Sequence, residues 1–76
     1  MKEFLRYLVQ NLVDRPDAVE IHCSEEDEVF IAQVRVDPDD VGKVVGRRGT
    51  VVKALRTIAS IAAARLGRRV RIEVLN

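Results

Sequence analysis

The sequence predicts a small two-layer α+β domain in which helices cover one face of a three-stranded mixed sheet. Along the 76 residues, the spacing of apolar residues changes from a helical period to a period of two, returns to a helical period and ends with a period of two. The resulting order is helix, strand, strand, helix, helix, strand. Two consecutive strands should form a hairpin, and a crossover through helices should return the third strand parallel to the second. We expect residues 1–76 to form a single domain.

The first helix is expected over residues 2–14, because its apolar residues recur at spacings of three and four. Arg15-Pro16-Asp17 should end this helix, since proline disfavours helical geometry in the residue before it. The residues of the apolar face are Leu5, Leu8, Val9 and Leu12.

Two strands should follow the first helix. Apolar and polar residues alternate from Ala18 to Ser24, which predicts an exposed His22 and a buried Cys23, and they alternate again over residues 29–36. The acidic run at residues 25–28 should form a hairpin connection of about three to five residues. The apolar residues of the first strand are Val19, Ile21 and Cys23. On the second strand, one face should carry Phe30, Ala32, Val34 and Val36, and the other Val29, Ile31, Gln33 and Arg35.

The second half should hold two helices and a last strand. Residues 37–40, Asp-Pro-Asp-Asp, are typical of a helix start, with an acidic cap and carboxylates near the positive end of the helix dipole. The first of these helices should be short because Gly46 interrupts it, and the second is expected over residues 50–66, ended by Gly67. The expected buried residues are Val51, Leu55, Ile58, Ala62 and Leu66 on the long helix and Val70, Ile72 and Val74 on the strand.

Charge is segregated along the chain, although the net charge is only +1. Residues 1–40 hold four basic and eleven acidic residues, a net charge of −7, and residues 41–76 hold nine basic residues and one acidic residue, a net charge of +8. This asymmetry indicates a basic binding surface on the second half. The alternative is that the two halves neutralise each other in the fold. Basic residues near the C-terminus either extend this binding surface or keep an exposed strand soluble, and both interpretations stay open for Arg65, Arg68, Arg69 and Arg71.

Several other classes of protein are not expected. No apolar run approaches the roughly 18 residues that would span a bilayer, and the N-terminus does not read as a secretory signal. The single cysteine, Cys23, cannot form an intrachain disulfide, which favours a reducing cytoplasm. His22 and Cys23 should point to opposite faces of a strand without further ligands, so we expect no metal site. No nucleophile–base pair is evident, and we expect no catalytic residue, cofactor or small-molecule substrate.

The most informative segment is Gly46-Arg47-Arg48-Gly49, which lies between two predicted helices. Two glycines three residues apart allow a tight turn whose backbone amides can approach a ligand closely. Amides at a helix N-terminus favour an anion, and the two arginines add permanent cations. The preferred ligand is therefore a phosphate, although the glycine spacing differs from that of a nucleotide-binding P-loop. Further cations flank the turn at Lys43 and Lys53.

A helix–GxxG–helix unit on a three-stranded sheet is the arrangement with which a KH domain holds about four nucleotides of single-stranded backbone. The aromatic residues of this chain lie outside its basic half, so the bases should not stack on an aromatic platform. We expect the bases to lie against an aliphatic groove floored by Val45 and Val52. The aromatic residues are Phe4, Tyr7 and Phe30.

Three segments resemble the small bacterial stand-alone KH proteins of the KhpA family: LVDRPD at residues 12–17, VDPDDVGKVVG at residues 36–46 and KALRT at residues 53–57. The resemblance covers nearly the whole chain, and the element order matches the type II KH arrangement. The resemblance implies cytoplasmic RNA binding with the GRRG segment as the loop that grips the backbone. It also implies homodimers and pairing with a larger KH-containing partner.

We therefore expect a non-enzymatic single-stranded RNA-binding protein that acts as a post-transcriptional regulator or RNA chaperone. Phosphate contacts alone do not distinguish RNA from single-stranded DNA. The alternative function is a protein-interaction adaptor for which RNA contact is secondary. A second stripe on the long helix would either form a dimer interface or pack against the first helix of the same chain, and the sequence leaves both open. This stripe consists of Ala54, Thr57, Ile61 and Ala64.

Overall fold

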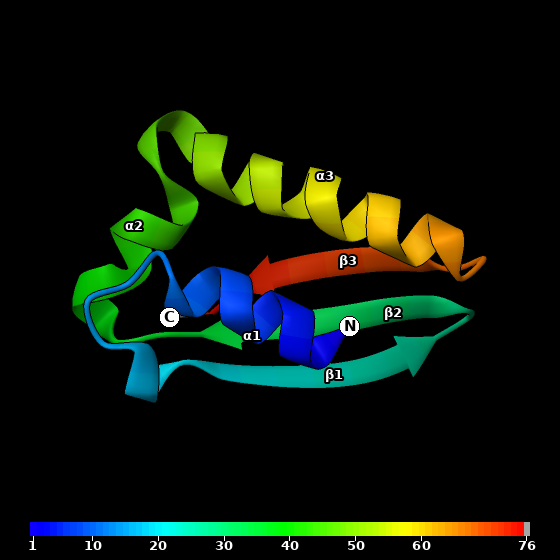
Figure 1. The fold of residues 1–76 in the computed structure, drawn as a ribbon, viewed down its shortest axis with the longest axis horizontal. Helices are drawn as coiled ribbons and strands as arrows, with labels where there is room; N and C mark the ends of the chain where they lie inside the picture. The colour runs from blue at the N-terminus through cyan, green and yellow to red at the C-terminus, as the bar shows by residue number, and fades with distance from the viewer. Residues whose placement is uncertain (76) are drawn as a thin grey trace.

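The computed structural model describes residues 1–75, whose arrangement is shown in Figure 1. These residues form helices and strands in the predicted order, which is confirmed. The helices are α1 (Lys2–Gln10), α2 (Val41–Val45) and α3 (Thr50–Arg65), and the strands are β1 (Glu20–Glu26), β2 (Val29–Arg35) and β3 (Arg69–Val74). Single 3₁₀ turns lie at η1 (Pro16–Ala18), η2 (Pro38–Asp40) and η3 (Arg47–Gly49).

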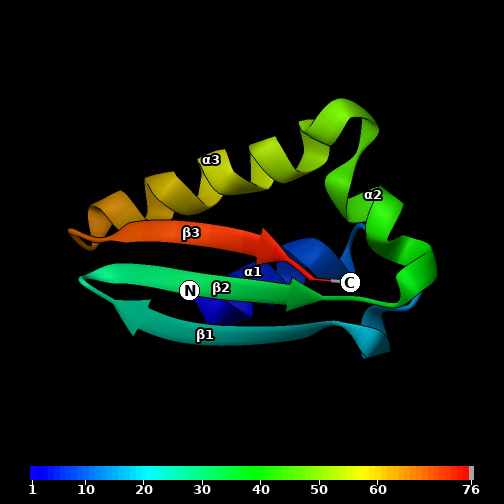
Figure 2. The ribbon, with the colours of Figure 1, turned by 180° about the vertical axis from the view of Figure 1, so that it is seen from behind.

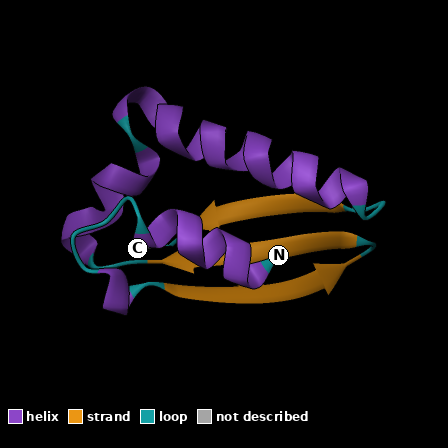
Figure 3. Cartoon of the chain, in the orientation of Figure 1, coloured by secondary structure: helices purple, strands orange, loops and turns teal. Residues whose placement is uncertain are grey.

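The three strands form one mixed sheet in the order β1-β2-β3. β1 pairs antiparallel with β2, and β3 pairs parallel with β2, so both predicted pairings are confirmed. At the centre of the sheet, Ala32 lies opposite Cys23 on one side and Ile72 on the other. α1 and α3 lie on one face of the sheet: α1 lies in front of the strands in Figure 3, and in Figure 2, seen from behind, the strands lie in front of α1.

The hydrophobic core fills the space between the sheet and the helices. α1 contributes Leu5 and Val9, each 1% exposed, and the short α2 contributes Val44, which is fully buried. Burial of apolar surface of this kind is the dominant favourable term in folding. The core therefore anchors every helix, including α2, which holds the start of the GRRG segment. The remaining core residues are Val19, Ile21, Ala32, Val34, Val36, Leu55, Ala59 and Ile72.

The first helix is shorter than predicted. α1 ends at Gln10 rather than at Asp14. The side-chain amide of Asn11 donates to the carbonyl oxygen of Tyr7 at 2.7 Å, and such local hydrogen bonds compete with continued helix. The helix therefore ends before the proline that was expected to stop it, although its predicted apolar face is correct.

Two expectations for the β1–β2 hairpin were wrong. β1 continues through Glu26, so the connection is only the two-residue turn Asp27–Glu28, with φ of 48° and 67°. Positive φ at both positions is the type I′ geometry, whose twist matches that of the flanking strands. Cys23 is exposed rather than buried, because β1 is an edge strand and its burial ends at Ile21, whereas His22 is exposed as predicted.

The predicted core stripe of α3 is correct only in part, since Leu55 is buried and Val51 and Ala62 are partly buried. Ile58 and Leu66 are 40% and 69% exposed, whereas the buried stripe is Val52, Leu55, Ala59 and Ala63. Alanines have no bulk beyond Cβ, so α3 can pack closely against the sheet through them. The pattern of large side chains alone did not indicate this. None of the helices described here is both long and apolar enough to cross a membrane.

Candidate nucleic-acid interface

The GRRG segment forms a tight turn between α2 and α3, at the end of the molecule opposite the β1–β2 hairpin (Figure 1). The amide of Gly46 donates to the carbonyl oxygen of Gly42 at 2.9 Å and ends α2. The turn then closes with a hydrogen bond from the Gly49 amide to the Gly46 carbonyl oxygen at 3.1 Å. α3 begins at Thr50, and its N-cap Gly49 provides no side-chain hydrogen bond to the positive end of the helix dipole.

Gly46 is required for a reason internal to the fold. Its φ is +77°, and a Cβ built there would lie 2.4 Å from the Val51 Cγ2 and 2.8 Å from the Val51 backbone nitrogen. No real Cβ approaches other atoms so closely, so the first glycine lets α2 turn back onto the start of α3. Gly49 also has a positive φ, +76°, but its nearest neighbour, the Val52 Cγ1, would be 3.9 Å away. Glycine is therefore needed at position 49 for its backbone conformation and not because another atom lies close to it.

The two arginines of the turn are exposed. Arg48 adopts a left-handed conformation, with φ of 57° and ψ of 27°. Within residues 1–75, neither guanidinium group has a carboxylate at ion-pair distance. The turn therefore presents two permanent and uncompensated positive charges beside a helix N-terminus.

The other predicted contact residues lie on both sides of the turn. Val45 is half-buried at the end of α2, and Val52 is buried in the first turn of α3 with 7% of its surface exposed. Lys53 is exposed on the outer side of α3. The fold therefore places these three residues beside the glycine turn.

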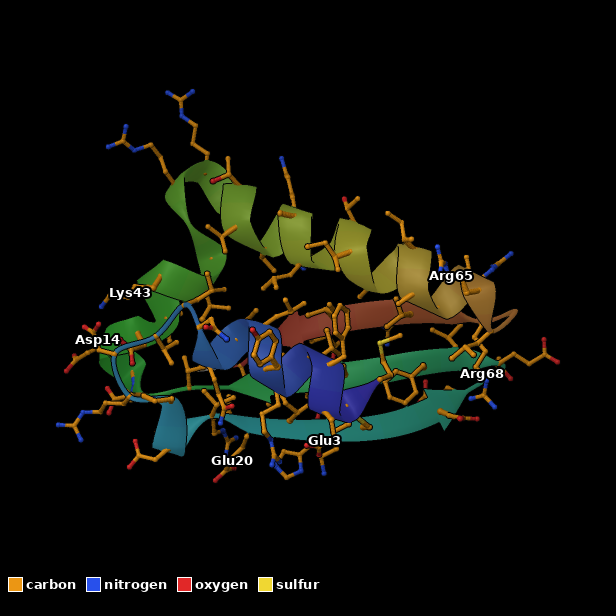
Figure 4. The ribbon with its side chains drawn as sticks, in the orientation of Figure 1. Glu3, Asp14, Glu20, Lys43, Arg65 and Arg68 are labelled. Carbon is orange, nitrogen blue, oxygen red and sulfur yellow. The ribbon has the colours of Figure 1, made fainter. Side chains whose placement is uncertain are left out.

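Lys43 has a different environment from the other cations. Its Nζ lies 3.0 Å from the Asp14 Oδ2 and 3.2 Å from the Asp40 Oδ1, and Figure 4 shows Lys43 and Asp14 next to each other at the base of α2. The second oxygen of Asp40 accepts a hydrogen bond from the Arg15 backbone amide at 3.1 Å. We refer to Asp14, Asp40 and Lys43 as the Lys43 cluster.

The contacts of the Lys43 cluster shift the pKa values of Asp40 and Lys43. Burial raises the pKa of Asp40, but hydrogen bonds from Lys43 and from the backbone amides of Arg15 and Asp14 outweigh burial and hold this pKa below its ordinary value. Hydrogen bonds to Asp14 and Asp40 raise the pKa of Lys43. Both groups are therefore stabilised in their charged forms.

Sequence reasoning missed the role of Asp40. The three aspartates of residues 37–40 were expected to provide an acidic cap and carboxylates near the positive end of a helix dipole, and Asp37 is a cap that accepts a hydrogen bond from the Asp39 amide at 2.9 Å. Asp40 makes no cap hydrogen bond and is 2% exposed within the Lys43 cluster. The spacing of three residues between Asp40 and Lys43 could have indicated an ion pair. Nothing in the sequence indicated the participation of Asp14.

Basic residues near the C-terminus lie at the far end of the molecule, where Figure 4 labels Arg65 and Arg68. Arg68 forms an ion pair with Glu25 of β1, and the Arg71 Nε lies 3.5 Å from the Glu73 Oε2. The Arg68–Glu25 pair therefore neutralises one cation of the basic half with a carboxylate of the acidic half at this end, whereas Arg71 and Glu73 both belong to β3. The turn carrying Arg47 and Arg48 is not neutralised in this way.

The predicted second stripe of α3 faces solvent. Ala54, Thr57, Ile61 and Ala64 are all exposed, and Ile61 retains 58% of its accessible surface. The stripe therefore does not pack against α1 of the same chain, which was one of the two possibilities left open by the sequence.

Comparison with known proteins agrees with this geometry. Residues 2–74 match the family described as KhpA/KhpB, KH domain. The RNA-binding protein KhpA of Borreliella burgdorferi is 39% identical over 74 residues, covering 97% of this chain and 90% of that protein. The protein of the same name from Chlamydia pneumoniae is 40% identical over 75 residues, covering 99% of this chain and 96% of the relative.

Two solved structures of Era share the fold. A structure of Era from Aquifex aeolicus bound to GDP and AlF4⁻ gives a TM-score of 0.70 at 20% identity, and covers 96% of this chain. A complex of Era with MgGDPNP and nucleotides 1506–1542 of 16S ribosomal RNA gives a TM-score of 0.71 at 21% identity. In each case this chain matches 28% of the Era chain. The architecture is thus the predicted KH-like α+β fold, and the chain belongs to the KhpA/KhpB KH-domain family.

Proposed function

We propose that this protein binds single-stranded RNA through the GRRG turn and does not act as an enzyme. The observation that carries the proposal is the turn itself, in which two exposed arginines without a carboxylate at ion-pair distance among residues 1–75 lie beside the uncapped start of α3. Relatives that match nearly the whole chain are named RNA-binding proteins, and a neighbour with the same fold was solved with ribosomal RNA.

In the proposed mode, RNA phosphates meet Arg47 and Arg48 while the backbone of Gly46 and Gly49 lets the RNA backbone approach closely. The bases lie against the aliphatic surface at Val45, with the buried Val52 beneath it, and Lys53 supplies a further charge. Because most of these contacts are to phosphate, affinity should depend strongly on salt and base preference should be modest. We place this activity in the cytoplasm, as a post-transcriptional regulator or RNA chaperone.

The first experiment is fluorescence anisotropy with matched single-stranded RNA, single-stranded DNA and duplex RNA at two salt concentrations. Salt-sensitive binding to single strands, lost in an Arg47→Asp/Arg48→Asp variant, is the expected result. Circular dichroism of the variant serves as the folding control, because both side chains are exposed. A variant that stays folded and retains full RNA affinity would refute the proposal.

A specific observation favours a second function, self-association through α3. Ile58 and Ile61 are 40% and 58% exposed, although large apolar side chains are usually buried. Small residues at Ala54 and Ala64 would let a second helix approach closely. One groove that holds about four nucleotides binds weakly, and joining two grooves would raise the apparent affinity. The partner would be a second copy or a larger KH-containing protein.

The association surface is tested by Ile61→Asp, because a charge at the centre of an apolar contact should prevent close approach. Light scattering should give the mass of a dimer for the unaltered protein and that of a folded monomer for the variant. Lys53→Asp, which places the same charge on an exposed position outside the stripe, is the matched control. Persistence of the dimer in the Ile61 variant would exclude this surface.

A further inference from the structure

The Lys43 cluster ties together three segments that are separate in the sequence. Asp14 and Arg15 lie between α1 and β1, Asp40 ends η2, and Lys43 lies on α2. One hydrogen-bonded carboxylate, that of Asp40, joins all three, since it contacts the Arg15 amide through one oxygen and the Lys43 ammonium group through the other. The cluster therefore fixes α2 relative to the segment that follows α1.

The charge of the cluster disfavours a phosphate. Two carboxylates surround one ammonium group, so the three side chains together carry a charge of −1. The neighbouring pair of Arg15 with Asp37, at 3.7 Å, leaves that sum unchanged. An ammonium group has three donors, and two of these are directed at Asp14 and Asp40. A phosphate approaching Lys43 would be repelled by both carboxylates.

α2 needs external support to hold the GRRG turn. The helix has five residues, and so short a helix has little stability of its own. Val44 anchors one side of it in the core, and the Lys43 cluster holds the other. The turn begins directly from this helix, because the Gly46 amide donates to the carbonyl oxygen of Gly42. A change in the direction of α2 would therefore move the turn.

We propose that Lys43 is a positioning residue, which acts on RNA affinity by orienting α2 and the GRRG turn through Asp14 and Asp40 and does not contact phosphate. The inference rests on the proposed function, since it concerns the same turn. It revises the expectation from sequence that Lys43 and Lys53 serve alike as flanking cations. Among residues 1–75, Lys53 has no carboxylate at ion-pair distance, so it provides a matched control.

The decisive variant is Asp40→Asn, because the two roles predict opposite signs. If Lys43 acts through the cluster, Asp40→Asn should weaken RNA binding several-fold by loosening α2. If Lys43 instead contacts phosphate, removing the competing carboxylate should strengthen binding. Asp14→Asn is the second variant, since 78% of the Asp14 side chain is exposed and its replacement should not prevent folding. Tighter RNA binding by either folded variant would overturn the proposal.

Lys43→Met and Lys53→Met complete the test. Lys43→Met should lower the melting temperature by several degrees, because a buried carboxylate loses its partner, and should leave the salt slope of RNA binding unchanged. Lys53→Met should leave the melting temperature unchanged and reduce the slope by about 0.7, the value for one phosphate on a single strand. A reduced slope with an unchanged melting temperature in Lys43→Met would refute the positioning role.

A readout without RNA separates this inference from the proposed function. In NMR spectra of the free protein, Asp40→Asn and Lys43→Met should both shift the amide resonances of Gly46 and Gly49. Unchanged turn amides in both variants would contradict the inference even if RNA binds. If the unaltered protein binds no RNA, the proposed function fails, and shifted amides would still support the coupling of the cluster to the turn.

Discussion

The two ends of this small domain carry similar arginines in different surroundings. At the GRRG end, Arg47 and Arg48 are exposed, and within residues 1–75 no carboxylate lies at ion-pair distance from them. At the hairpin end, Arg68 is paired with Glu25, a residue distant in the sequence. Among residues 1–75, the fold thus pairs one arginine at the hairpin end and keeps carboxylates away from both arginines of the GRRG turn.

The glycine turns at the two ends differ in a second way. Gly46 and Gly67 both have positive φ, +77° and +69°. A Cβ at Gly46 would collide with Val51, whereas a Cβ at Gly67 would meet nothing within 4 Å. Glycine is therefore required at position 46 by helix packing as well as by backbone conformation, whereas at position 67 it is required by backbone conformation alone.

Replacing each of these two glycines with alanine should give the largest difference in stability between the two ends. Gly46→Ala should lower the free energy of unfolding by about 3 kcal/mol, because overpacking adds to the strain of a positive φ. Gly67→Ala should lower it by only about 1 kcal/mol, the cost of a left-handed alanine. Urea denaturation of both variants measures the difference. Equal losses would contradict the assigned clash with Val51.

Acid unfolding should distinguish the contribution of the buried Asp40 carboxylate to stability from that of an exposed carboxylate. The pKa of Asp40 is lowered in the fold, with hydrogen bonds from Lys43 and backbone amides outweighing burial. A lowered pKa stabilises the fold at pH values above the ordinary pKa of aspartate, about 3.9. This stabilisation is lost as the pH falls through the pKa of Asp40 in the folded protein.

The unaltered protein should therefore exceed Asp40→Asn in stability at pH 7, and this difference should shrink as the pH falls below about 4. Glu25→Gln, at the hairpin end, is the matched control, since 55% of the Glu25 side chain is exposed. The control should change little in stability over the same range. A stability difference for Asp40→Asn that does not vary with pH would count against the ion-pair cluster.

The smallest effect is expected from breaking the ion pair at the hairpin end. Half of the Arg68 side chain is exposed, so Arg68→Gln should cost less than about 1 kcal/mol of stability. RNA affinity should not change, because this arginine lies away from the GRRG turn. Parallel urea and anisotropy titrations check both expectations. A marked loss of RNA affinity would extend the proposed interface to the hairpin end.

Much of the fold could be predicted from local pattern. The period of two over β2 and β3, and the crossover between them, gave the mixed sheet because these features depend on neighbouring residues and chain direction. The GRRG turn was recognisable because glycine and arginine have few substitutes at such a site. The long helix was placed correctly, but its buried face only in part, since alanines such as Ala59 and Ala63 carry little hydrophobic signal.

The parts that could not be predicted depend on contacts between distant residues. The Arg15 amide and the Asp40 carboxylate are 25 residues apart in sequence, and no local pattern relates them. The ion pair of Arg68 with Glu25 likewise forms only because the hairpin and the end of α3 meet. Cys23 was misassigned because alternation indicates the face of a strand and not how far the covering helix extends.

The central claim is tested most directly by reversing charge at each end in turn. Arg47→Asp/Arg48→Asp and Arg65→Asp/Arg69→Asp change the net charge equally, and each should be compared with the unaltered protein for binding to single-stranded RNA by anisotropy. We predict that the first variant, still folded by circular dichroism, loses RNA binding by at least about 100-fold, as expected when two phosphate contacts are reversed in sign. The second should retain most of its affinity because Arg65 and Arg69, which also have no carboxylate at ion-pair distance within residues 1–75, lie away from the GRRG turn. Equal losses in the two variants would show that net charge alone governs binding and would contradict the account.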